Sequence, residues 1–365
     1  MARFTCPFCM SQYDKKEVQY FCPQCNAPSV PRFLEREPIK CQKGCGGYAT
    51  DRRCPKCGRS LPKESLETPN LPFSIVGVSN SGKTNYITVM LHELGRAPGL
   101  RLALGAQTKY TRDHQNENYS GLTEHHLPPE GTNSGEPEPQ IWYIKNQGKR
   151  HGNIVPTYTF TIFDGAGEDH ENMDPSSSVC RYINASEAII LTLDPLILQN
   201  IRLGNVVDPR ALRNSRNGGG RDGERNAVDV VNSVASYIKS ARGIRANRML
   251  DIPVAVVLTK FDTILDHGSF APTALIKQKS RIIDQQHFNK TEMQQVSQEI
   301  RDWLYEIGEG SFIDALESQF KEFYFFGVSS FGSAPDERNR LTGELRPHRV
   351  LDPIMWLFNK KGFID

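Results

Sequence analysis

The clearest chemical pattern in this chain is the run from 77 to 84, Gly-Val-Ser-Asn-Ser-Gly-Lys-Thr, which fits the pattern GxxxxGK(S/T). An apolar run precedes it and a helix-like run follows it. The glycines let the backbone wrap an anion, and N–H groups at the following helix start would point at a β-phosphate. We expect Lys83 to reach the β- and γ-phosphate oxygens and Thr84 to place its hydroxyl on Mg²⁺. The other loop residues expected to contact the nucleotide are Gly77, Ser79, Asn80, Ser81 and Gly82.

A second candidate segment, Asp164-Gly165-Ala166-Gly167-Glu168, follows an apolar run. An acidic residue leaving a buried strand beside a phosphate-binding loop is suited to the second Mg²⁺ contact, so we assign Asp164 to magnesium. The Gly167 N–H would sense the γ-phosphate as the hinge of a switch loop. An ordinary Asp-Gly turn is the alternative.

A third segment, Thr259-Lys260-Phe261-Asp262, also ends an apolar run. The Asp262 carboxylate can accept hydrogen bonds from N1–H and the exocyclic amine of guanine, a pair of donors that adenine lacks on that edge. The Lys260 stem would lie along the base, and a later turn at Ser329 and Ser330 would offer backbone N–H to guanine O6. The alternative is a strand-end turn whose Asp caps a helix.

Eight of the nine cysteines lie in four close pairs near the start of the chain. Four thiolates suffice for one closed tetrahedral zinc site, and such sites are structural because no position remains for water. Pairing in sequence order predicts two tandem zinc ribbons, and an interleaved pairing would use the same ligands. Those ligands are Cys6, Cys9, Cys22, Cys25, Cys41, Cys45, Cys54 and Cys57.

The partner of this cysteine-rich head is predicted from its charge. Its excess of Lys and Arg is largely cancelled by two Zn(Cys)₄ centres, each formally −2. Aromatic residues of the head could stack on nucleic-acid bases, but in so small a module they more often form its core. We therefore favour a protein partner over nucleic acid.

The overall composition is that of a globular protein, with 38% apolar and 24% charged residues among 365 and a formal charge of +2. This charge argues against a strongly basic nucleic-acid binder. We find neither a signal-peptide pattern nor a long uninterrupted apolar run. We expect a cytoplasmic protein without membrane association.

Apolar strands alternate with helical stretches after about residue 67, which predicts a mainly parallel, doubly wound α/β sheet with its ligand at the strand C-terminal ends. We expect a zinc-ribbon module at 1–66 and a nucleotide-binding domain at 67–365. The expected strands are 73–78, 141–145, 158–163, 188–193, 254–259 and 323–328, and the expected helices are 83–94, 227–241, 290–307 and 353–359.

Two polar segments interrupt this alternation, at about 105–139 and 200–226. We expect the first to be a mobile loop that supplies a switch threonine to Mg²⁺ and the γ-phosphate. Thr132 is our choice, with Thr123 as the alternative. The second is arginine-rich and is expected to be a solvated loop.

The order GxxxxGKT, DxAG, TKxD and a late serine turn resembles that of the P-loop GTPases of the translation-factor and small-GTPase class. The match covers roughly residues 70 to 365. Within that class the cysteine-rich head, the SGKTNYITVMLHEL run and the HRVLDPIMWLF run look like the bacterial double-GTPase family, associated with conflict and signalling loci. The resemblance implies a nucleotide-dependent switch acting on GTP and GDP, and a second GTPase or an activating protein as partner.

Two residues depart from the pattern of that class. Thr259 stands where Asn is usual, so a side-chain amide that braces the P-loop is replaced by a hydroxyl. Glu168 stands where small GTPases carry a water-orienting Gln. A carboxylate cannot donate a hydrogen bond to the γ-phosphate, so we predict slow hydrolysis. A nucleotide-binding scaffold without turnover, or an ATP-dependent enzyme acting on nucleic acid, are the alternative functions.

Overall fold

The computed structural model describes residues 4–31, 38–77, 81–129, 138–148, 157–164, 178–198, 227–265, 269–284 and 287–365. Five of the predicted site residues lie outside these ranges: Ser79, Asn80, Thr132, Gly167 and Glu168. The predicted loop at 200–226 also lies outside them.

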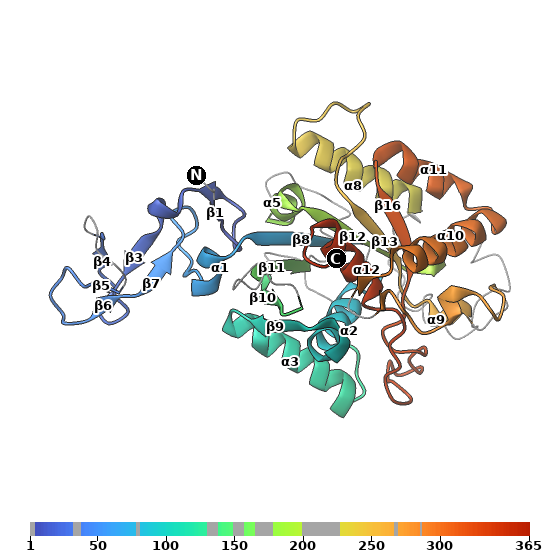
Figure 1. Cartoon of the computed structure of the whole chain (residues 1–365), viewed down its shortest axis with the longest axis horizontal. Helices are drawn as coiled ribbons and strands as arrows, with labels where there is room; N and C mark the ends of the chain where they lie inside the picture. The colour runs from blue at the N-terminus through green and yellow to red at the C-terminus, as the bar shows by residue number, and fades with distance from the viewer. Residues whose placement is uncertain are drawn as a thin grey trace.

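A seven-stranded sheet forms the centre of the larger part of the chain (Figure 1). Five neighbouring strands are parallel, whereas β10 is antiparallel to both of its neighbours, β11 and β9. This confirms the prediction of a mainly parallel α/β sheet. In spatial order the strands are β16 (Phe323–Gly327), β13 (Val254–Leu258), β12 (Ala188–Leu193), β8 (Asn70–Val76), β11 (Thr157–Asp164), β10 (Gln140–Asn146) and β9 (Leu102–Ala106).

Helices cover both faces of this sheet, because its central strands carry apolar side chains on both sides. On one face α2 (Lys83–Arg96) and α12 (Asp352–Lys360) pack against the sheet, and α3 (Lys109–Glu124) lies beside α2. The other face is covered by α5 (Ser178–Ala185), α8 (Ala227–Ala241) and α11 (Gly310–Gln319). Helix α10 (Lys290–Glu306) packs along the edge strand β16.

Shorter elements complete this part of the chain. They are α1 (Lys63–Glu67), α9 (Asp262–Leu265), the strands β14 (Ile283–Asp284) and β15 (His287–Phe288), and the 3₁₀ turns η2 (Pro98–Leu100), η3 (Pro195–Ile197) and η4 (Leu275–Lys277). In the described part of the chain, every helix is too short or too polar to cross a bilayer.

The predicted mobile loop at 105–139 was wrong for much of its length, because residues 109–124 form α3. Its N-cap is Thr108, whose hydroxyl accepts a hydrogen bond from Thr111 N–H. The buried face of α3 is formed by Thr111, Gln115 and Leu122, two of which are polar. An apolar helical period is therefore absent from the sequence although one face of the helix is buried.

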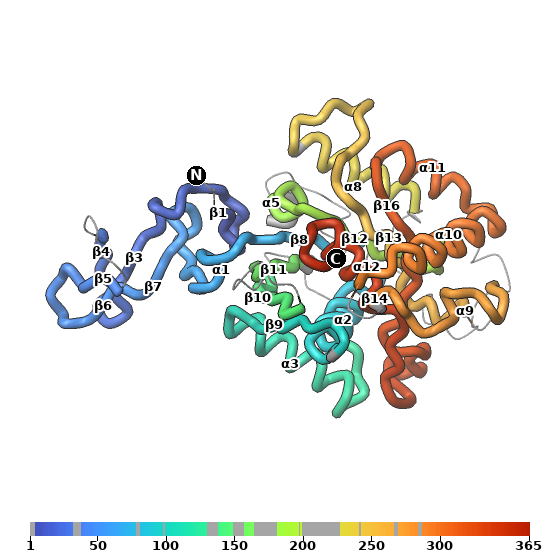
Figure 2. The backbone as a smooth tube through the Cα atoms, in the orientation of Figure 1, coloured from blue at the N-terminus to red at the C-terminus, as the bar shows by residue number. Residues whose placement is uncertain are grey.

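The cysteine-rich head is an elongated module that projects from the sheet domain (Figures 1 and 2). The short strands β4, β5 and β6 lie at its far end, and α1 leads from the module into β8. A small apolar cluster near the sheet domain includes Phe4, Tyr13 and Leu61. The module contains β1 (Phe4–Thr5), β2 (Gln12–Tyr13), η1 (Lys15–Glu17), β3 (Gln19–Phe21), β4 (Pro28–Ser29), β5 (Ile39–Lys40), β6 (Tyr48–Ala49) and β7 (Asp51–Arg53).

Candidate functional site

The candidate phosphate-binding loop connects β8 to α2 at the carboxyl edge of the sheet. Gly82 has φ of 77° and precedes the first residue of α2, so the loop enters the helix through a left-handed position that suits glycine. The Lys83 side chain is buried, and its Nζ donates a 3.1 Å hydrogen bond to the Gly77 carbonyl. Thr84 follows in the first turn of α2. The loop thus has the cation and the helix N-terminus of an anion site.

Thr259 connects the loop after β13 to this phosphate loop. Its Oγ1 lies 2.6 Å from the Ser81 carbonyl and 3.2 Å from the Leu193 carbonyl. The hydroxyl carries one proton, and the shorter contact indicates that it is donated mainly to Ser81. Thr259 therefore braces the loop backbone from the position where the related pattern has Asn.

Sequence reasoning missed two residues, Thr192 and Asp194, that contact this loop or the residues around it. Thr192, in β12, has its Oγ1 at 3.1 Å from Ser81 Oγ and at 3.2 Å from the Val76 carbonyl. A Cβ atom on Gly77 would lie 2.3 Å from Thr192 Oγ1, so only glycine fits there. The only sequence signal for Thr192 is its place near the end of an apolar strand.

The second missed residue is Asp194, which directly follows β12. Its carboxylate lies 2.7 Å from Lys260 Nζ, and it also accepts a hydrogen bond from Leu196 N–H. The Lys260 stem passes over Gly82, with its Cε 3.8 Å from the place of a Cβ there. Asp194 therefore holds Lys260 across the phosphate loop.

The two segments predicted to contact the base lie side by side. Phe261 N–H donates to the Val328 carbonyl at 3.0 Å, and Val328 N–H donates to the Leu258 carbonyl at 2.9 Å. Asp262 is half-buried at the start of α9. The Ser329 N–H is bonded to the His348 carbonyl, whereas no backbone acceptor faces Ser330 N–H among the described residues. Within the described ranges, Ser330 is therefore the one of the two serines whose N–H is without a backbone acceptor.

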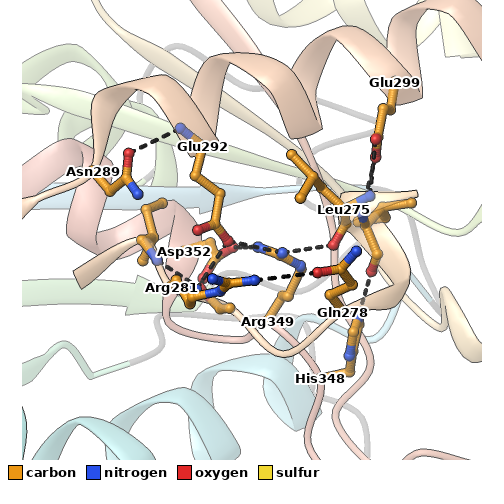
Figure 3. Close-up of polar contacts among 12 residues, drawn as sticks. Leu275, Gln278, Arg281, Asn289, Glu292, Glu299, His348, Arg349 and Asp352 are labelled. Carbon is orange, nitrogen blue, oxygen red and sulfur yellow. Dashed lines mark hydrogen bonds and ion pairs between the residues drawn. The ribbon is translucent and has the colours of Figure 1, made fainter. Parts of the chain in front are cut away.

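A buried ionic cluster holds the segment that follows the serine turn (Figure 3). The Arg349 guanidinium lies 2.9 Å from Glu292 and 2.7 Å from Asp352, and it donates to the Leu275 carbonyl. The neighbouring His348 ring nitrogen bonds to the Ile276 carbonyl at 2.6 Å. Because His348 also pairs with Ser329 through two backbone bonds, the cluster anchors the base segment to α10 and α12.

The magnesium and switch residues are described only in part. Asp164 is the last residue of β11 and lies in register with Ile75 of the neighbouring β8. Thr123, the alternative switch threonine, lies on α3, where its hydroxyl donates to the Tyr119 carbonyl of its own helix. Thr132, Gly167 and Glu168 lie outside the described residues, so their roles remain predictions.

The eight cysteines of the head form two clusters, but not in the order that the sequence suggested. One contains Cys6, Cys9, Cys54 and Cys57, and the other contains Cys22, Cys25, Cys41 and Cys45. We call the first the outer centre and the second the inner centre, because the ligands of the second lie between those of the first in the sequence. The expectation of two tandem ribbons paired in sequence order was therefore wrong. Pairing of β3 with β7 brings the first and last half-sites together, and the inner centre is nested between them.

Both clusters have the dimensions of a zinc site. Two sulfur–sulfur distances between the half-sites are 3.8 and 3.9 Å in the outer centre, and two are 3.5 Å in the inner centre. All four sulfurs of each cluster lie within 4.8 Å of one another. Tetrahedral zinc with bonds of about 2.3 Å requires about 3.8 Å between sulfurs. Phe8 N–H and Lys56 N–H also donate to Cys6 and Cys54 sulfurs, as expected of zinc knuckles. The donor set and its spacing fit two closed structural zinc sites.

Comparison with known proteins finds distant similarity. No protein-family model matches the chain. The putative ESX-1 scaffolding and assembly protein SaeC of Mycolicibacterium smegmatis is 24% identical over 343 residues, which is 85% of this chain and 80% of that protein.

Among solved structures, similar folds include the Arl6 BBS3 small GTPase of Trypanosoma brucei, with 13% identity, 81% of this chain and 99% of that chain covered, and a TM-score of 0.31. The S. cerevisiae Ski7 GTPase-like domain bound to GTP has 14% identity, covers 83% of this chain and 53% of that chain, and has a TM-score of 0.33.

Proposed function

We propose that this chain is a Mg²⁺-dependent GTP-binding switch that hydrolyses GTP slowly. The observation that carries the proposal is the bond from Thr259 Oγ1 to the Ser81 carbonyl. This bond joins the phosphate loop to the segment 259–262, which would contact the base. One ligand with both a phosphate tail and a base would therefore contact both segments.

Each end of a guanine nucleotide has a chemical counterpart here. Lys83, Thr84 and the N-terminus of α2 would hold the phosphates. The Asp262 carboxylate would accept from N1–H and the exocyclic amine of guanine, and Ser330 N–H would donate to O6. Lys260, held by Asp194, would lie along the base.

Thr84 and Asp164 would hold Mg²⁺, which would neutralise charge on the β- and γ-phosphates. Thr132 and Gly167 would close on the γ-phosphate, and Glu168 would face the attacking water. Because Glu168 cannot donate a hydrogen bond to the γ-phosphate, intrinsic turnover should be slow and an activating protein would accelerate it. Single-turnover hydrolysis with Mg²⁺ measures this rate, and a rapid intrinsic rate would contradict the proposed role of Glu168.

The output would pass through the zinc head to a protein partner. A relative whose name includes scaffolding and assembly supports a partner-binding role, as does the head's projection from the sheet. A second GTPase, as in the bacterial double-GTPase family of conflict and signalling systems, would be such a partner. A non-hydrolysing nucleotide-binding scaffold is the second candidate, favoured by the same relative.

Competition between GTP and ATP for the Mg²⁺-loaded protein tests the proposal. We expect strong GTP preference that is lost in Asp262→Ala. Asp314→Ala, which removes an exposed carboxylate on α11, should keep the preference. Equal affinity for GTP and ATP, or a preference for ATP, that Asp262→Ala leaves unchanged would contradict guanine recognition by Asp262. It would favour an ATP-dependent enzyme.

A further inference from the structure

A tyrosine of α5 bonds the outer zinc centre to the sheet domain. The Tyr182 hydroxyl donates to the carbonyl of Phe8, which lies between the ligands Cys6 and Cys9. Tyr182 is only 3% exposed, and burial raises the pKa of its hydroxyl, so it remains a protonated donor. The zinc knuckle is therefore bonded directly to the helix that follows the segment 165–177.

The other side of Tyr182 connects to the candidate magnesium residue. Its ring stacks on Phe163, with centroids 4.1 Å apart and planes at 12°. Phe163 is buried in β11 and directly precedes Asp164. A shift of β11 or α5 at the nucleotide edge would therefore move the tyrosine that holds the knuckle.

Met10 shows that this contact is built into the module. It has φ of 58°, at the left-handed position that closes the Cys6–Cys9 knuckle, where the equivalent turns carry Asn26, Gly46 and Gly58. Methionine is disfavoured in that conformation. Its side chain is 7% exposed and belongs to the same apolar cluster as Tyr182 and Phe163. Packing against the sheet domain explains why methionine stands there.

The inner centre lacks such a connection. In the described part of 21–51, no hydrogen bond or ion pair reaches the sheet domain. The outer centre has further contacts, from Asn70 Nδ2 to the Thr5 carbonyl and from Arg59 to Glu138. The two centres thus serve as test and control within one chain.

We propose that Tyr182 is a positioning residue that couples the outer zinc centre to the nucleotide state at the end of β11, where Phe163 precedes Asp164. This inference rests on the proposed function and names the contact through which the head would respond. Because coupling between two sites is reciprocal, the nucleotide state must change the zinc affinity of the outer centre, and zinc there must change the relative affinity for GTP and GDP.

The test is a chelator competition on the full-length zinc-loaded chain, with GDP and with a non-hydrolysable GTP analogue. The Cys22→Ser/Cys25→Ser variant, which retains only the outer centre, assigns the two zinc affinities. We expect the outer affinity to differ about fivefold or more between the nucleotides, and the inner affinity to be equal. In Tyr182→Phe, which keeps the stacked ring, the difference should shrink below about twofold.

Tyr48→Phe makes the same chemical change on an exposed tyrosine of β6, near the inner centre. It should retain the wild-type difference in outer zinc affinity between the two nucleotides. The inference is overturned if nucleotide binds and the outer affinity is equal in both states, or if Tyr182→Phe retains the difference. Absence of guanine-nucleotide binding would overturn the proposed function as well, so the two failures are distinguishable.

Discussion

Thr259 shows how one hydroxyl replaces the amide of the related motif. Its short bond to the Ser81 carbonyl links the loop after β13 to the loop after β8, and both residues are buried. A buried carbonyl that loses its donor costs about 1–3 kcal/mol. Because this carbonyl belongs to the phosphate loop, the loss should affect ligand binding and folding together.

We therefore predict that Thr259→Val lowers the free energy of unfolding by about 1–3 kcal/mol and weakens GTP binding by about tenfold. Urea denaturation and equilibrium nucleotide titration measure the two effects. Thr161→Val is the matched control, because Thr161 is also a buried threonine, and its hydroxyl donates to the Asn70 side chain. It should lose stability but retain GTP affinity, and equal loss of affinity in both variants would refute the bracing role.

Sequence reasoning predicted site residues where the chemical patterns are strong, but it missed the residues that contact them. Lys83, Thr259 and Asp262 stand in recognisable motifs, whereas Thr192 and Asp194 act only because β12 lies beside β8 and β13. Strand adjacency is a long-range property, so no local pattern reports it. Ser329 shows the same limit, since its N–H is taken by His348 across a distant segment.

At the scale of elements, burial leaves a record in the sequence from which the central strands and the larger helices could be predicted: continuous apolar runs in the strands and an apolar period in the amphipathic helices. Strand β12 and helix α8 have the bounds expected from that record. Helix α3 could not be predicted in the same way. Gln115 donates to the Thr88 carbonyl, and Thr111 accepts from Ile141 N–H, so its buried face is satisfied by hydrogen bonds rather than apolar packing.

The Arg349 cluster gives an element-scale prediction for the segment that carries the serine turn. Arg349→Met would leave Glu292 and Asp352 as buried carboxylates without their cation. We expect a loss of about 3–5 kcal/mol in the free energy of unfolding at neutral pH. We also expect weaker GTP binding, because Ser329 is held through His348. Urea denaturation and GTP titration measure both.

The pH dependence of that variant has a definite sign. Burial raises the pKa of Asp352 in the folded state, and Arg349 opposes this shift. Removing Arg349 should therefore raise the pKa further. A carboxyl whose folded pKa exceeds its unfolded pKa stabilises the fold when protonated and loses that contribution as pH rises. The deficit of Arg349→Met should be smaller at low pH than at neutral pH, and a constant deficit would contradict the ionic account.

At the scale of the whole molecule, the nesting of the two zinc centres determines how the head is attached. The cysteine pairs look alike in the sequence, so the half-sites that share a centre are identified only in three dimensions, by the sulfur clusters and by the β3–β7 ladder. Nesting places the outer centre next to the sheet domain and the inner centre at the far end. The far end of the head therefore projects away from the sheet domain, while its near end contacts α5.

Zinc stoichiometry tests this nesting. Cys22→Ser/Cys41→Ser removes two ligands of the inner centre, so we predict that the purified variant retains one zinc of two. Pairing in sequence order would place one of these ligands in each centre, and both would then be damaged. Elemental analysis gives the count. Cys6→Ser/Cys54→Ser should likewise retain one, and loss of both zinc ions in either variant would contradict nesting.

We proposed that Asp262 and Ser330 recognise guanine beside the loop that Thr259 braces. Exchanging the hydrogen-bonding pattern of the base tests this most directly. Xanthine carries a carbonyl where guanine has its exocyclic amine. Asp262→Asn would present an amide donor to that carbonyl and an acceptor to N1–H. Titration of the variant with GTP and XTP should show GTP affinity falling, and XTP affinity rising, by about tenfold or more relative to the unmodified chain. A variant that keeps its GTP affinity and gains none for XTP would contradict the claim.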